Sequence, residues 1–179
     1  ASRDNTVRVW RLADGQEEHR LEHASQVEAV VTRPGDRLVS IQDSGPIQEW
    51  NLFTGKLQRS FDDGKGRAAT VLSLGADKLA VSRGVDMVEL WDLDGGRIEK
   101  TIAVDHRLVV AMALMPDGML ALGDADGGID LWDVGADALS KPIRRGNAGE
   151  GRSVTVLHAL ADGRIVYSVH ANRPRWCGI

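Results

Sequence analysis

Five histidines, one cysteine and a short acidic loop are the parts of this sequence that could support catalysis or metal binding. The histidines are His19, His23, His106, His158 and His170, and the cysteine is Cys177. A nucleophilic serine or cysteine needs a base beside it. Cys177 has no such partner nearby in the sequence, and no serine lies in a Gly-x-Ser-x-Gly setting. We assign no set of metal ligands to the histidines and therefore expect a protein that is not an enzyme and has no metal site.

The acidic loop Asp124-Ala-Asp126-Gly-Gly has two of the positions of a calcium-binding loop. It lacks the third ligand and the closing glutamate of an EF-hand, and a turn between two strands explains it better. The sequence also has no Gly-x-x-x-x-Gly-Lys phosphate loop and no dinucleotide-binding fingerprint. We therefore expect no cofactor.

Composition and charge limit the possible partners. The chain has 179 residues, 42% of them hydrophobic and 27% charged, and a net charge of −4 that is spread along its length. Nucleic-acid binding needs a basic face, and a membrane span needs about 18 or more uninterrupted apolar residues. Neither feature is present in the sequence, and its single cysteine fits a reducing compartment. We expect a cytoplasmic protein that binds neither nucleic acid nor membrane.

A periodic series of tryptophans organises the chain. Trp10, Trp50, Trp91, Trp132 and Trp176 follow one another at intervals of 40, 41, 41 and 44 residues, and each ends a short strand-like segment. Turn signals recur between two apolar runs of each repeat, at 33–36, 75–77, 115–118 and 161–163. A period of about 40 to 45 residues closing on Trp or Trp-Asp is typical of four-stranded propeller blades.

These repeats resemble the WD40-repeat family of β-propellers, in a degenerate form of bacterial type, over essentially the whole chain. The resemblance implies an all-β fold with about four four-stranded antiparallel blades in this chain, as part of a ring of seven or eight. The strand pattern places the blades at 1–22, 23–62, 63–103, 104–145 and 146–179. The first segment would supply only the third and fourth strands of a blade, and the last would lack its outer strand.

The incomplete first and last blades predict that this chain is the C-terminal part of a larger propeller. The missing strands would come from another chain or from a cleaved N-terminal piece, and the exposed blade faces would favour association. The alternative is that the chain begins in the middle of a blade only because it was truncated there.

The resemblance further implies a hydrogen-bonded chain in each blade, made by a His, a Ser or Thr, an Asp and the Trp. Such a network is structural, because buried polar groups must be paired. In the second repeat Asp43 is displaced by one residue from the usual position, and in the fourth Leu122 replaces the hydroxyl. The matching residues are His23, Ser40, Asp43 and Trp50 in the second repeat, His106, Asp126 and Trp132 in the fourth, Asp4 and Trp10 in the first, and Trp91 in the third. We expect the third and last blades, which lack the network, to be the least stable.

A basic rim is the candidate partner-binding surface. In the family, the loops that precede the first strand and those that join the second and third strands emerge on one side. The residues placed there are Arg3, Ser25, Arg67, Arg83, Arg107 and Arg152. Arginine suits carboxylate or phosphate recognition, although aspartates in the same loops would weaken the field.

The function that this pattern favours is a non-catalytic scaffold or sensor that binds protein partners, including the chain that supplies the missing blades. Similar propellers often occur in bacterial signalling or caspase-like protease systems. The alternative is a self-assembling half-propeller that forms a homo-oligomeric ring.

Overall fold

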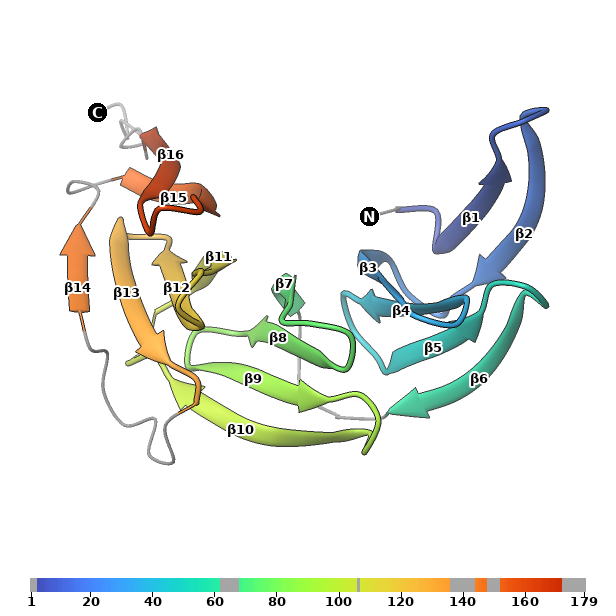
Figure 1. The fold of residues 1–179 in the computed structure, drawn as a ribbon, viewed down its shortest axis with the longest axis horizontal. Helices are drawn as coiled ribbons and strands as arrows, with labels where there is room; N and C mark the ends of the chain where they lie inside the picture. The colour runs from blue at the N-terminus through green and yellow to red at the C-terminus, as the bar shows by residue number, and fades with distance from the viewer. Residues whose placement is uncertain (1–2, 62–67, 106, 136–143, 148–151, 172–179) are drawn as a thin grey trace, which may run out of the picture. The chain divides into compact units, whose positions relative to one another are not determined.

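The computed structural model describes residues 3–61, 68–105, 107–135, 144–147 and 152–171, and this described part contains β-strands and no helix (Figure 1). The second sheet consists of β3 (Val27–Arg33), β4 (Arg37–Gln42), β5 (Ile47–Asn51) and β6 (Lys56–Phe61), paired in chain order. The third has β7 (Ala68–Ser73), β8 (Lys78–Arg83), β9 (Met87–Asp92) and β10 (Arg97–Ala103), and the fourth β11 (Val109–Leu114), β12 (Met119–Asp124), β13 (Gly128–Asp133) and β14 (Arg144–Asn147). The predicted all-β fold of four-stranded antiparallel sheets is confirmed.

Two-stranded sheets account for the other described strands. The first sheet pairs β1 (Thr6–Arg11) with β2 (Gln16–Glu22), and the fifth pairs β15 (Arg152–Ala159) with β16 (Ile165–Ala171). The strand predicted around Trp176 lies outside the described residues. Strand β14 continues to Asn147, two residues beyond the predicted blade boundary at residue 145.

The chain divides into two compact units. The first contains Ala1–Gly84 and Glu89–Lys100, and the second contains Val85–Val88 and Thr101–Ile179. We describe each unit separately.

The predicted turns join the first and second strands of four sheets. In the second sheet, the turn between β3 and β4 has positive φ angles at Gly35 (77°) and Asp36 (53°), a conformation that glycine and aspartate tolerate better than most residues. One regular feature was not predicted: the register of the first strand shifts between Val27 and Ala29 in β3 and at the matching position in β7, β11 and β15. A bulge in each first strand increases its local twist.

Apolar side chains join neighbouring sheets inside each unit. In the first unit, Val39, Ile41 and Ile47 of the second sheet pack in one cluster with Val81 and Trp91 of the third. In the second unit, alanines of β11 and β12 pack against Val154 and Leu157 of β15. Burial of alternate strand residues therefore stabilises these seams, as expected for strands covered on both faces.

Candidate functional site

A hydrogen-bonded chain runs through the second sheet from His23 to Trp50. Ser40 is fully buried, and its Oγ lies 2.7 Å from His23 Nε2 and 2.9 Å from Trp50 Nε1, which donates to it. His23 Nδ1 lies 3.0 Å from the carbonyl oxygen of Leu21. Since a carbonyl only accepts, Nδ1 carries the proton, and in the neutral ring Nε2 accepts from the Ser40 hydroxyl. Burial lowers the pKa of His23, consistent with that neutral form.

The Gln42 side chain joins the two loops at the end of this sheet. Gln42 is 1% exposed, its Oε1 accepts from the backbone and hydroxyl of Ser25, and its Nε2 donates to Pro46 O at 3.0 Å. Asp43 contributes main-chain bonds: its N–H donates to Gln26 O and its carbonyl accepts from Ala68 N–H. The place of the Asp43 side chain in the hydrogen-bonded chain with His23 stays a prediction.

The third sheet has a polar network of another kind, built from an arginine and a glutamate in place of a histidine and a serine. Trp91 Nε1 donates to Glu89 Oε2 at 3.0 Å, and Arg83 Nε donates to the same oxygen at 3.3 Å. Glu89 and Arg83 are 0% and 3% exposed. Arg83 was predicted on the exposed rim; that prediction is wrong, because the guanidinium is buried beside an acid on the neighbouring strand.

In the fourth sheet Asp124 and Asp130 are buried, whereas the predicted Asp126 is exposed. Asp124 Oδ1 accepts from the N–H groups of Asp126 (2.9 Å) and Gly128 (2.7 Å). Arg107 Nη1 lies 3.1 Å from Asp124 Oδ2 and 3.5 Å from Asp130 Oδ2, so one guanidinium bridges two carboxylates. A Cβ on Gly128 would lie 2.3 Å from Asp124 Oδ2, which explains the glycine. The acidic loop is therefore a closed turn around Asp124.

Trp132 occupies the tryptophan position of the fourth sheet without the hydroxyl that serves Trp50. It is 2% exposed, and within the described part of the chain its Nε1 has no hydrogen-bond partner. Leu122, at the position of Ser40, is buried and offers no acceptor. His106 lies outside the described residues.

The first sheet does not join its two predicted network residues. Asp4 accepts from the N–H and hydroxyl of Thr6 and from Arg8 Nη2 at 2.7 Å, which makes it part of an exposed turn. Trp10 is 50% exposed, in contrast to Trp50 at 7%.

The polar groups of the three four-stranded sheets occupy matching positions. Gln42, Arg83 and Asp124 each lie eight residues before their tryptophan, and Gln48, Glu89 and Asp130 lie two residues before it. Gln42 Nε2 lies 3.3 Å from Gln48 Oε1, as Arg83 lies beside Glu89. Since the chemistry differs in each repeat, only the constant distance from the tryptophan could have revealed these pairs in the sequence.

Of the predicted rim, Arg3 and Arg152 are exposed. Ser25 is half-buried against Gln42, Arg107 is held by two aspartates, and Arg67 lies outside the described residues. The structure thus assigns internal contacts to several of the side chains that were predicted to meet a partner.

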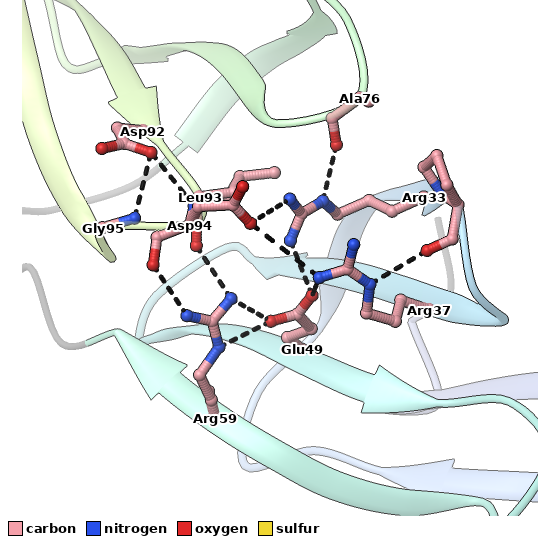
Figure 2. A network of polar contacts seen from close by, with 10 residues as sticks. Arg33, Arg37, Glu49, Arg59, Ala76, Asp92, Leu93, Asp94 and Gly95 are labelled. Atoms are coloured by element: carbon pink, nitrogen blue, oxygen red, sulfur yellow. Dashed lines mark hydrogen bonds and ion pairs between the residues drawn. The ribbon is translucent and has the colours of Figure 1, made fainter.

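A second group of charges links the second and third sheets inside the first unit (Figure 2). Glu49 is 1% exposed and accepts from Arg33 Nη1 at 2.7 Å and Arg59 Nε at 2.7 Å, while Arg37 Nη1 lies 3.4 Å away. Arg33 also donates to Asp94 Oδ1 at 2.8 Å. Although burial opposes its charge, these acids raise the pKa of Arg33, and the hydrogen bond from Arg33 lowers the pKa of Asp94. Sequence analysis did not single out this cluster.

Across the described ranges, no three His, Cys, Asp or Glu side chains are grouped so that they could hold a metal ion. Within the described residues there is no helix long and apolar enough to cross a membrane. His19 and His23 are four residues apart, but His19 lies against the turn at Gly55 whereas His23 bonds to Ser40.

Comparison with known proteins identifies relatives that consist of WD repeats. The chain is 24% identical over 183 residues to "Apoptotic protease-activating factor 1" of Rattus norvegicus, covering 98% of this chain and 15% of that protein. It is 28% identical over 152 residues to "U3 small nucleolar RNA-associated protein 4" of Schizosaccharomyces pombe, covering 78% of the chain and 21% of that protein. It is 24% identical over 155 residues to "Protein tipD" of Dictyostelium discoideum, covering 85% of this chain and 25% of that protein.

These relatives and the sheets agree with the WD40 resemblance. No family model matches the chain. The chain spans 15% to 25% of the length of these relatives, so it corresponds to a part of each.

Proposed function

We propose that this chain is a non-catalytic scaffold or sensor module of WD40 type, whose blade faces are completed by strands from another chain or from a separate piece of the same protein. The WD-repeat relatives support a role in binding proteins. The buried charged groups described above pair with one another within the fold, which agrees with a structural role.

The observation that carries the proposal is the exposed apolar face of the first sheet. Trp10 is 50% exposed and Leu12 is 97% exposed. Their counterparts in the third sheet, Trp91 and Leu93, are 3% and 0% exposed, because they pack against the second sheet. An apolar pair that is buried in one repeat and exposed in another marks a surface that a partner would cover.

The partner that fits this face is a further sheet of the same type, since Trp91 and Leu93 meet such a sheet. A regulatory role in a bacterial signalling or caspase-like protease system is part of the proposal. Its support is that a relative's printed name refers to protease activation. A cytoplasmic location is also part of the proposal, and the single cysteine supports it. Partners other than nucleic acid and membranes are proposed as well, because the sequence has no basic face and no long apolar run.

Native mass spectrometry of the purified protein tests the proposal. A stoichiometric companion containing Trp-ended repeats is the expected result. Masses that are multiples of 19.4 kDa would instead support the self-assembling half-propeller. A folded 19.4 kDa monomer would contradict both.

A matched pair of variants locates the surface. Trp10→Ser with Leu12→Ser removes the exposed pair, and we expect the complex to dissociate at a concentration at least about tenfold higher than wild type. Phe53→Ser removes an aromatic that is 82% exposed in a turn of the second sheet and should leave association unchanged. Equal effects of the two changes would overturn the assignment of this face.

A further inference from the structure

The ionic cluster between the second and third sheets has no counterpart in the other repeats. Glu49 immediately precedes its tryptophan, and the residues in that position elsewhere are Val9, Leu90 and Leu131. Arg33 lies four residues before the second strand, where the following repeats have Leu74 and Met115. One sheet of this chain therefore carries charges where its neighbours carry apolar side chains.

The second sheet contributes more positive than negative charge to this seam. Arg33, Arg37 and Arg59 all lie within 4.0 Å of Glu49, so one buried carboxylate faces three guanidinium groups of its own sheet. The side chains of Arg33 and Glu49 are each 1% exposed. The buried pair is balanced in charge, but Glu49 bonds to only one nitrogen of the Arg33 guanidinium. Because buried N–H groups must be hydrogen-bonded, the other Arg33 donors need acceptors from the neighbouring sheet.

The third sheet supplies those acceptors (Figure 2). Arg33 donates to Asp94 Oδ1 at 2.8 Å and to Ala76 O at 2.6 Å. Arg59 donates to the carbonyl oxygens of Leu93 (2.9 Å) and Asp94 (3.0 Å). Asp94 lies three residues after its tryptophan, and the residues in that position in the other repeats are Ala13, Phe53 and Gly135. Among these repeats, only the third has a carboxylate at that position.

We propose that the Arg33–Glu49–Arg59–Asp94 cluster is a pairing lock, which selects the third sheet as the neighbour of the second and rejects the other apolar sheet faces of this chain or of a second copy. A sheet without this carboxylate would leave the Nη2 group of the buried Arg33 guanidinium without its acceptor. Such a mismatch disfavours a wrong pairing more than it strengthens the right one. This inference is independent of the partner proposed for the first sheet.

The chain itself supplies the variant that tests selectivity. Replacing Arg33 by Leu, Glu49 by Leu and Arg59 by Lys transfers the third repeat's residues Leu74, Leu90 and Lys100 to the second sheet. Apolar replacement of a buried ionic group usually keeps a protein folded. We expect this triple variant to fold but to populate larger species in native mass spectrometry, with the fraction of non-native oligomer rising about tenfold over wild type. A triple variant with the wild-type mass distribution would overturn the lock.

A single substitution keeps the test valid if the triple variant does not fold. Asp94→Asn removes the carboxylate that crosses the seam, while Glu99→Gln removes an acid of the same sheet that pairs with Lys78 at 2.7 Å on the surface. We expect amide exchange in β4 and β8 to accelerate about tenfold in the first variant and to be unchanged in the second. Equal exchange in the two variants would contradict the proposal.

Discussion

The buried polar side chains around Trp50 and Trp91 form hydrogen bonds within their own sheets. Ser40 is at once the acceptor for Trp50 and the donor to His23, so a single hydroxyl satisfies two rings. Glu89 accepts the indole N–H of Trp91 in the same way, and its carboxylate also forms an ion pair with Arg83. A hydroxyl in one sheet and a carboxylate in the next thus each supply the acceptor that a buried indole N–H requires.

Removal of the Ser40 hydroxyl should therefore leave two buried groups unsatisfied. We expect Ser40→Ala to lower the free energy of unfolding by about 1–3 kcal/mol, measured by urea denaturation. Ser60→Ala, at an exposed position of β6, is the control and should change stability by less than about 0.5 kcal/mol. A loss as small as that of the control would show that the hydrogen-bonded chain contributes nothing.

His23 should make stability depend on pH. Its folded pKa is lowered below the ordinary value near 6.5, chiefly by burial, so the unfolded chain binds a proton first as pH falls. The contribution is complete above about 6.5 and is lost as pH falls from there through the folded pKa. We expect stability to decrease on acidification in this window, and His23→Gln to flatten the curve. Parallel curves for the two proteins in urea titrations between pH 7.5 and 5.5 would rule out this role.

Sheets approach each other closely where small residues replace larger ones. Gly123 of β12 has no unusual φ, yet a Cβ on it would lie 2.6 Å from Val154 Cγ1 of β15. Gly96 in the β9–β10 turn similarly lies against the ring of Phe61. The packing of neighbouring strands requires these glycines. Because the residues that they contact are about 30 or more positions away in the sequence, the sequence alone does not show why glycine is needed.

Gly123→Ala should consequently destabilise the seam between β12 and β15. We expect a loss of about 1–3 kcal/mol from overpacking, measured by thermal or urea unfolding. Val154→Ala in the same protein should recover part of the loss, because it removes the clashing methyl groups. The control Gly135→Ala places a Cβ 3.3 Å from the nearest atom, Asp133 Oδ1, and should have a much smaller effect. A Gly123→Ala protein as stable as this control would contradict the packing argument.

The stability of the repeats follows from their seams more than from the presence of the usual network residues. The third sheet was expected to be weak, but it buries Arg83, Glu89 and Trp91 and shares the apolar cluster with the second sheet. The fifth sheet has one buried face, while Val156 and Val166 are 56% and 53% exposed. Its outer surface therefore gains no comparable burial.

Hydrogen exchange should reveal this order. We expect the amides of β8 and β9 to be protected as well as those of β4 and β5, and those of β15 and β16 to exchange about tenfold faster or more. The measurement is exchange detected by mass spectrometry of peptides from the intact protein. Faster exchange in β8 than in β16 would restore the original expectation of a weak third repeat.

The sequence by itself determined the strands, because alternation, turn residues and the tryptophan period are local signals. It also located Ser40 and Trp50, whose hydrogen bond joins neighbouring strands of one sheet. It did not reveal that Arg83 is buried, that Asp124 replaces Asp126 as the buried acid, or that Arg33 meets Asp94, 61 residues away. Only tertiary structure decides such matters, because the burial and pairing of a charge depend on which distant sheet covers it.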